Sequence, residues 1–138
     1  MSHATAESSS VETGTVYEIG FDIERLVPCP ENHIEKIACV GRIEKKDFLV
    51  SILEQTDGSN YNPLDIRAKI VFNGDDTYFM NRQGIVRHGS NYYLADKDRF
   101  LMGLTITACP NKKGILTPVI DKRRGVKKER DTRVWRQV

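Results

Sequence analysis

The chain has 138 residues, of which 39% are hydrophobic and 29% charged, and its net charge is +2. This composition is typical of a folded domain with one hydrophobic core and excludes a wholly disordered chain. No apolar run approaches the roughly 20 residues needed to span a bilayer, and the N-terminus lacks the basic start and apolar core of a secretory signal. We therefore expect an intracellular protein, cytoplasmic or nuclear, with no membrane partner.

The composition changes along the chain and predicts three parts. Residues 1–14 are rich in Ser, Thr, Ala and Glu, which do not form a core, so we expect a disordered N-terminal segment. Residues 15–121 carry the periodic hydrophobic patterns of a single domain. Residues 122–138 form a basic C-terminal segment, either the loop and edge strand of a hairpin or a tail.

Strand patterns begin the ordered part. Residues 15–23 alternate between apolar and other positions, which is typical of a strand with one buried face. Pro28 and Pro30 follow and end that run, because proline cannot donate to a strand ladder. Residues 33–40 predict a second strand, and Gly41 predicts a turn after it.

The hydrophobic period changes in residues 42–55. Phe48, Leu49 and Ile52 recur at roughly helical spacing, and no Gly or Pro interrupts them, so we predict a helix of about three turns. Val50 and Ser51 leave a strand as the competing interpretation. Turn-forming residues then fill 56–63. This stretch is not a calcium-binding loop. Such a loop needs a bidentate Glu at its twelfth position, and counting from Asp57 that position is Ala68.

The clearest pattern covers residues 65–95. Apolar and polar residues alternate from Asp65 to Phe72, and Asn73-Gly74 provides the positive φ angles of a tight turn. Three further short strand patterns follow, at 77–80, 85–87 and 92–95, each separated from the last by turn residues. The stretch predicts an antiparallel meander.

The rest of the domain continues this pattern. Asp96 stands where a helix N-cap is expected, strands are predicted at 104–108 and 115–120, and Pro118 marks the second as an edge or bulged strand. Residues 132–138 also alternate and could pair with 115–120. The predicted fold class is α+β: mainly an antiparallel β-meander, as a sheet or half-open barrel, with one or two short helices packed on it.

The three cysteines are an odd number without close pairing. In an intracellular chain we interpret Cys29, Cys39 and Cys109 as buried thiols rather than a disulfide framework. A zinc site from these cysteines and His33 is an alternative, but the spacing does not match the paired short spacings of structural zinc sites. We predict no metal ligand and no cofactor.

Positive charge is concentrated at the C-terminus. Residues 121–138 hold eight Lys or Arg and three acids, for +5, whereas the remainder holds 13 basic and 16 acidic residues, for −3. Clustered cations attract nucleic acid because they neutralise phosphates and release counterions, and a tryptophan among them can stack on an unpaired base. We predict a non-catalytic binding protein that contacts nucleic acid, DNA or RNA, through Lys122, Arg123, Arg124, Lys127, Lys128, Arg130, Arg133, Trp135 and Arg136.

Other functions remain open. The same basic segment could bind an acidic protein surface, as in an inhibitor, immunity or accessory protein. Asp22 with Glu44 and Lys46 follows the order seen in metal-dependent nucleases, in which two carboxylates hold a cation. A ligand cleft lined by tyrosines is a further alternative, formed by Tyr61, Tyr78, Tyr92 and Tyr93. No catalytic residue is assigned.

Overall fold

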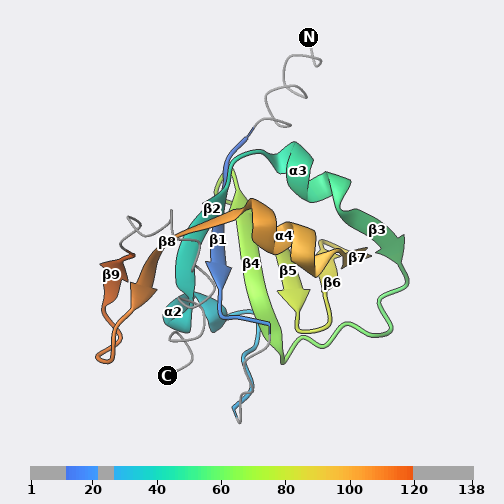
Figure 1. The fold of residues 1–138 in the computed structure, drawn as a ribbon. Helices are drawn as coiled ribbons and strands as arrows, with labels where there is room; N and C mark the ends of the chain where they lie inside the picture. The colour runs from blue at the N-terminus through green and yellow to red at the C-terminus, as the bar shows by residue number, and fades with distance from the viewer. Residues whose placement is uncertain (1–11, 22–26, 120–138) are drawn as a thin grey trace.

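The computed structural model describes residues 12–21 and 27–119, which form nine strands and three short helices (Figure 1). The strands are β1 (Gly14–Glu18), β2 (Cys39–Ile43), β3 (Leu53–Thr56), β4 (Ile66–Phe72), β5 (Asp76–Asn81), β6 (Ile85–His88), β7 (Asn91–Ala95), β8 (Leu104–Pro110) and β9 (Leu116–Pro118). The helices are α2 (Ile34–Ile37), α3 (Lys46–Ser51) and α4 (Lys97–Gly103). No helix in these ranges is long and apolar enough to cross a lipid bilayer.

All nine strands belong to one antiparallel sheet, in the order β3-β7-β6-β5-β4-β1-β2-β8-β9. The sheet is open, with β3 at one edge and β9 at the other. Strands β4 to β7 are consecutive in the chain and adjacent in the sheet, which is the meander predicted from residues 65–95. Asn73 and Gly74 have φ angles of 56° and 85° and make its first turn. The predicted α+β fold class is confirmed.

The predicted helix over residues 42–55 is wrong in its extent. Arg42 and Ile43 continue β2, α3 covers only Lys46–Ser51, and β3 begins at Leu53. Ile43 of β2 and Leu49 of α3 are both fully buried. The apolar residues of 42–55 therefore belong to a strand, then a helix, then a second strand. The period looked helical because consecutive elements bury their apolar residues in the same core.

The predicted strand over residues 33–40 is also corrected. Residues 34–37 form α2, which buries Ile34, and extended structure starts only at Cys39. Gly41 lies inside β2 rather than in a turn. A Cβ atom there would lie 2.2 Å from the carbonyl oxygen of Thr105 on β8. This glycine therefore permits the close approach of two strands.

The first strand is shorter than the predicted 15–23. β1 ends at Glu18, and Gly20 adopts a φ of 90°, which takes the chain out of extended conformation. Ile19 still donates its backbone N–H to the Arg67 carbonyl at 3.0 Å. Residues 22 and 23 lie outside the described ranges.

Two hydrophobic clusters pack on the two faces of the sheet. The larger contains Val16, Ile70, Leu49 and Phe100, and α3 and α4 cover this face (Figure 1). The smaller is formed by Ile19, Cys29, Ile34, Ala38 and Ile66, with Tyr17 and Phe79 packed against it. Neighbours along a strand point to opposite faces, so β1 and β5 contribute to both clusters.

One charged residue of β4 breaks the predicted alternation. Arg67 was expected on the face away from the core, but only 1% of its surface is exposed. The β4–β5 register shifts between Ile66 and Ala68, which turns Arg67 inward. Its guanidinium donates to the Gly20 carbonyl at 2.7 Å and to the Asp65 carboxylate at 3.1 Å. Burial is tolerated because these acceptors replace water.

Candidate nucleic-acid interface

The nine residues predicted to contact nucleic acid lie outside the described ranges. They are Lys122, Arg123, Arg124, Lys127, Lys128, Arg130, Arg133, Trp135 and Arg136. The predicted pairing of residues 132–138 with 115–120 lies outside them too. The nearest described part of the chain is the hairpin of β8 and β9, which ends at Val119. This hairpin is therefore the part of the basic end that the structure describes.

The turn of the β8–β9 hairpin is organised by one asparagine. Asn111 donates its backbone N–H to the Ile115 carbonyl at 2.8 Å, and its side-chain oxygen accepts from the N–H groups of Lys113 and Ile115. Gly114 has a φ of 82°, which a residue with a side chain rarely adopts. The turn is thus a defined structure that presents Lys112 and Lys113 to solvent.

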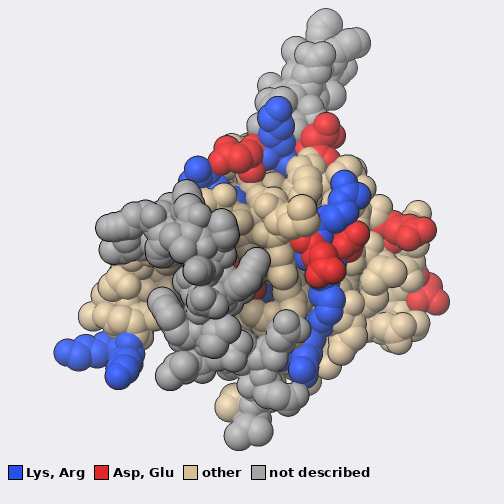
Figure 2. Space-filling model, in the orientation of Figure 1, with Lys and Arg blue, Asp and Glu red and all other residues tan. Residues whose placement is uncertain are grey.

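The hairpin is free of acidic residues. No Asp or Glu occurs between Asp98 and Asp121, and neither Lys112 nor Lys113 forms an ion pair with any residue the structure describes. Figure 2 shows basic side chains at the end of the molecule where the hairpin lies. Within residues 12–21 and 27–119, no carboxylate therefore competes with a phosphate for these two cations.

The rest of the described chain is close to neutral. Residues 12–21 and 27–119 contain 12 basic and 13 acidic residues. Five of these cations form ion pairs with carboxylates of the same domain: Arg42, Lys46, Arg67, Lys69 and Arg87. The domain surface as a whole therefore carries no excess positive charge to attract a polyanion.

Apolar residues lie beside the lysines. Ile115 is 57% exposed and Leu116 is 49% exposed. The outer edge of β9 is also poor in hydrogen-bond donors. Val119 donates its N–H inward to the Thr107 carbonyl, so the backbone of residues 116 and 118 faces outward, and Pro118 has no N–H. Among the described strands β9 lies at the edge of the sheet, which agrees with the predicted edge or bulged strand at Pro118. An edge with few donors is a poor template for pairing with another strand.

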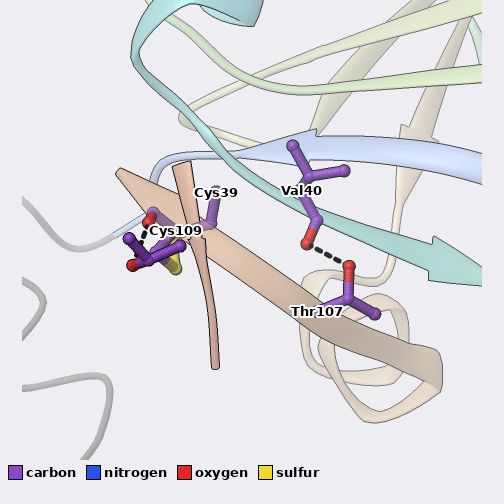
Figure 3. The surroundings of a disulfide bond; sticks show 5 residues. Cys39, Val40, Thr107 and Cys109 are labelled. Carbon is purple, nitrogen blue, oxygen red and sulfur yellow. Dashed lines mark hydrogen bonds between the residues drawn. A yellow bond between two sulfur atoms is a disulfide. The ribbon is translucent and has the colours of Figure 1, made fainter. Parts of the chain in front are cut away.

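A disulfide lies at the base of the hairpin (Figure 3). Cys39 at the start of β2 is bonded to Cys109 near the end of β8, 70 residues away in the chain. The prediction of three buried thiols is wrong for this pair and confirmed for Cys29, which is buried and takes no part in the disulfide. The pair could not be read from spacing, because the sheet order that brings β2 beside β8 is a tertiary property.

A group of polar side chains centred on Glu31 joins β6 to the segment before α2. Arg87 donates to both carboxylate oxygens of Glu31 at 2.8 Å, and the Tyr61 hydroxyl donates to Glu31 at 2.5 Å. The hydrogen bonds from Arg87 hold the pKa of Glu31 below its ordinary value, whereas burial and the nearby carboxylate raise the pKa of Tyr61. Each charge has an opposite partner, so the cluster stabilises the fold and presents no free cation.

Cations and aromatic rings alternate on the same sheet face. The register pairs Tyr17 with Lys69, Lys69 with Phe79, Phe79 with Arg87 and Arg87 with Tyr92. Lys69 and Arg87 lie within 6.0 Å of neighbouring ring centroids. Such a row resembles a base-stacking surface in composition, but Lys69 is paired with Glu35 of α2 and Arg87 with Glu31. Its charges are already neutralised within the chain.

Another group of polar side chains, centred on Asp76, lies where β5 begins and β6 ends. The Asp76 carboxylate contacts Lys46 at 2.5 Å and His88 at 2.6 Å, and the His88 ring stacks on Tyr78. Burial acts to raise the pKa of Asp76, but the hydrogen bonds from Lys46 and His88 outweigh it, so that pKa lies below its ordinary value. Burial also raises the pKa of Tyr78 to about 12. The carboxylate orients the histidine, as a general-base pair requires. Within the residues that the structure describes, no hydroxyl or thiol forms a hydrogen bond with that imidazole.

The four tyrosines do not form one cleft. Tyr78 is 4% exposed and packs against Phe72 in the larger cluster. Tyr93 packs against that cluster as well, whereas Tyr61 and Tyr92 contact each other with ring centroids 5.5 Å apart. Tyr92 and Tyr93 face opposite sides of the sheet, as their adjacency requires. The cleft hypothesis is therefore not supported for this set.

The metal hypotheses find no assembled site. Asp22 lies outside the described ranges, and Glu44 is exposed and paired with Arg42. Two of the four zinc candidates, Cys39 and Cys109, are bonded to each other. Over residues 12–21 and 27–119, no three His, Cys, Asp or Glu side chains are grouped so that they could hold a metal ion.

Comparisons with protein-family models, with curated proteins and with solved structures found no match to this chain. The functional argument therefore rests on the residues and contacts described above.

Proposed function

We propose that the chain is a non-catalytic binding protein that contacts nucleic acid through its basic C-terminal end. This end comprises the β8–β9 turn, with Lys112 and Lys113, and the segment that holds Lys122, Arg123, Arg124, Lys127 and Lys128. The observation that carries the proposal is the separation of charge. The described domain is near neutral and internally ion-paired, whereas the acid-free hairpin leads into residues with a net charge of +5.

The physical reason is the behaviour of phosphate polyanions. Each phosphate that a Lys or Arg neutralises releases condensed counterions, and this release supplies most of the non-specific affinity. Ion-paired cations such as Arg87 contribute little, because a carboxylate already occupies them. The exposed apolar side chains of Ile115 and Leu116 add a surface that can contact bases, since isoleucine and leucine side chains insert between base steps in other complexes.

The test is a salt titration of oligonucleotide binding. Log affinity is expected to fall linearly with log salt, with a slope near −0.9 per duplex phosphate and about −0.7 per single-strand phosphate neutralised. Replacing Arg123, Arg124, Lys127 and Lys128 by Ala is expected to flatten the slope, and Lys112→Ala with Lys113→Ala to flatten it further. The matched control is Lys36→Ala with Lys45→Ala, two exposed lysines elsewhere on the domain.

The control pair is expected to leave the slope unchanged. An equal effect of both lysine pairs would show that binding follows net charge rather than this end of the molecule. Unchanged binding after truncation before Lys122 would refute the role of the basic segment. Binding to an acidic protein but to neither DNA nor RNA would instead establish the inhibitor or accessory function.

Trp135 provides a test of strand type. Replacing it by Ala is expected to weaken single-strand binding by about 1–3 kcal/mol if it stacks on a base, with a much smaller effect on duplex. Equal losses on both ligands would remove the stacking role and leave the charge-based proposal standing.

The cellular location belongs to the same proposal. The sequence favours an intracellular protein, which fits a nucleic-acid partner, whereas the Cys39–Cys109 disulfide is typical of oxidising compartments. Alkylation of the freshly isolated protein under denaturing conditions, in which the buried Cys29 also reacts, distinguishes the two. One alkylated cysteine means that the disulfide exists where the protein works, and three mean that the site is kept reduced.

A further inference from the structure

The β8–β9 hairpin is attached to the sheet along a short ladder. β8 pairs with β2 from Leu104 opposite Ile43 to Ala108 opposite Val40, with a register shift between Val40 and Gly41. At this irregular end the Thr107 hydroxyl donates to the Val40 carbonyl at 3.1 Å (Figure 3). The next residues along each strand are Cys39 and Cys109. The disulfide therefore closes the ladder at the point where the hairpin leaves the sheet.

Beyond the disulfide the hairpin packs against little of the chain that the structure describes. All eight residues from Asn111 to Pro118 are exposed, and β8 is the strand that pairs with β9 among residues 12–21 and 27–119. None of these residues belongs to either hydrophobic cluster. Within the part of the chain that the structure describes, the β2–β8 ladder, the hydrogen bonds of the hairpin and the covalent link to β2 hold the turn that carries Lys112 and Lys113.

We propose that the Cys39–Cys109 disulfide is a redox-controlled fastening of the β8–β9 hairpin. With the bond formed, the hairpin is held against β2 and its lysines occupy a fixed position. With the bond reduced, the end of β8 separates from β2 and the lysines lose that position. The effect on binding rests on the proposed nucleic-acid function, whereas the effect on the hairpin does not.

The reaction is ordinary thiol–disulfide exchange with a dithiol reductant. A thiolate of the reductant attacks one sulfur of the bond, forms a mixed disulfide and releases the other cysteine as a thiolate. The second thiolate of the reductant then displaces the remaining cysteine and becomes oxidised. Two electrons and two protons reach the protein, which ends with two thiols. Both cysteines are buried, at 5% and 9% exposure, so the reductant reaches the bond when this end of the sheet opens locally.

Hydrogen exchange tests the fastening directly. The amides of Ile106 and Ala108, which lie opposite Gly41 and Val40 of β2, are expected to exchange at least about 10-fold faster after reduction. Tenfold is a lower bound, because the stability lost with a native disulfide typically corresponds to more than a tenfold change in an equilibrium constant. Amides of β5 and β6, far from β2, are expected to change much less. A Cys39→Ser, Cys109→Ser variant should reproduce the reduced pattern without reductant, and Cys29→Ser should keep the oxidised pattern.

Two results would overturn the proposal. Unchanged hydrogen exchange in the hairpin after complete reduction, verified by thiol counting, means that the disulfide does not hold the hairpin against β2. Loss of the far-UV circular dichroism of the whole sheet on reduction means that the bond maintains the fold and not the hairpin alone. Reduction of the wild-type chain gives this answer even if the double serine variant fails to fold.

Oligonucleotide binding separates the two proposals. The reduced protein is expected to bind more weakly than the oxidised one, because the ligand must then fix a mobile hairpin. The Lys112→Ala, Lys113→Ala variant should lose most of this difference. Faster exchange in a protein that binds no nucleic acid in either state would leave the fastening correct and the proposed function wrong. Slow exchange with intact binding would mean the reverse.

Discussion

Ile70 lies in the middle of β4 and none of its surface is exposed. It belongs to the larger hydrophobic cluster, where Phe72 and Val16 lie nearby in the same face. We predict that Ile70→Ala lowers the free energy of unfolding by about 2–5 kcal/mol. The loss combines the transfer free energy of the removed methyl and methylene groups with the cost of the cavity that they leave in the core. Urea denaturation followed by circular dichroism measures this loss.

The control is Val50→Ala on the exposed side of α3, where 49% of the side chain is accessible. This change is expected to alter stability by no more than about 0.5 kcal/mol. Similar losses at both positions would contradict the assignment of Ile70 to the core.

The Glu31–Arg87 pair makes a pH-dependent contribution. Its side chains are about a quarter to a third exposed, so we expect a modest coupling of about 0.5–1.5 kcal/mol in a double-mutant cycle with Glu31→Gln and Arg87→Ala. The pKa of Glu31 is lowered below its ordinary value of 4.5. The coupling is therefore present above pH 4.5 and is lost as the pH falls through the folded-state pKa.

Measuring the cycle at pH 7 and at pH 3 checks this sign. A coupling that grows on acidification would mean that the protonated form of Glu31 is the one bound. Sequence could not reveal this pair, since the two residues are 56 positions apart and each is an ordinary charged residue. The buried Arg67 escaped prediction for a similar reason, because the bulge that turns it inward depends on pairing with β5.

Helix α4 is the element whose local signals were clearest. Asp96 precedes Lys97–Gly103, and its carboxylate accepts the backbone N–H of Arg99 at 3.2 Å, as the predicted N-cap requires. We predict that Asp96→Ala costs about 0.5–2 kcal/mol of stability, while Asp96→Asn retains most of it because an amide oxygen also accepts. Thermal or urea unfolding of the two variants measures the difference. Equal losses would mean that the amide oxygen of Asn does not replace the carboxylate as the cap, and no loss for Asp96→Ala would mean that the cap contributes nothing.

Helices α2 and α3 show where secondary-structure prediction from hydrophobic periodicity fails. Both are short, and their hydrophobic residues continue the series of a neighbouring strand. Over so few residues the periods of 3.6 and 2 are not distinguishable, so packing decides the conformation. The meander was predicted correctly because turn residues separate its strands and each strand keeps a regular alternation.

At the scale of the whole molecule, two clusters share one sheet. Leu49 in the larger and Ile34 in the smaller are both fully buried. We predict that Leu49→Ala and Ile34→Ala each lower stability by about 2–5 kcal/mol and shift a single unfolding transition, because β1 and β5 contribute to both clusters. Circular dichroism and tyrosine fluorescence should give coincident curves for each variant. Separate transitions would mean that the two faces unfold independently.

The sequence by itself determined the fold class, the meander with its Asn73-Gly74 turn, the cap at Asp96, the edge position of Pro118 and the concentration of charge at the C-terminus. These are local properties: alternation, backbone preferences of single residues and composition. Only the tertiary structure decided the sheet order, the Cys39–Cys109 bond, the Glu31–Arg87 pair and the burial of Arg67. Each of these joins residues far apart in the chain, and the free energy that selects one such arrangement comes from packing that no short window of sequence contains.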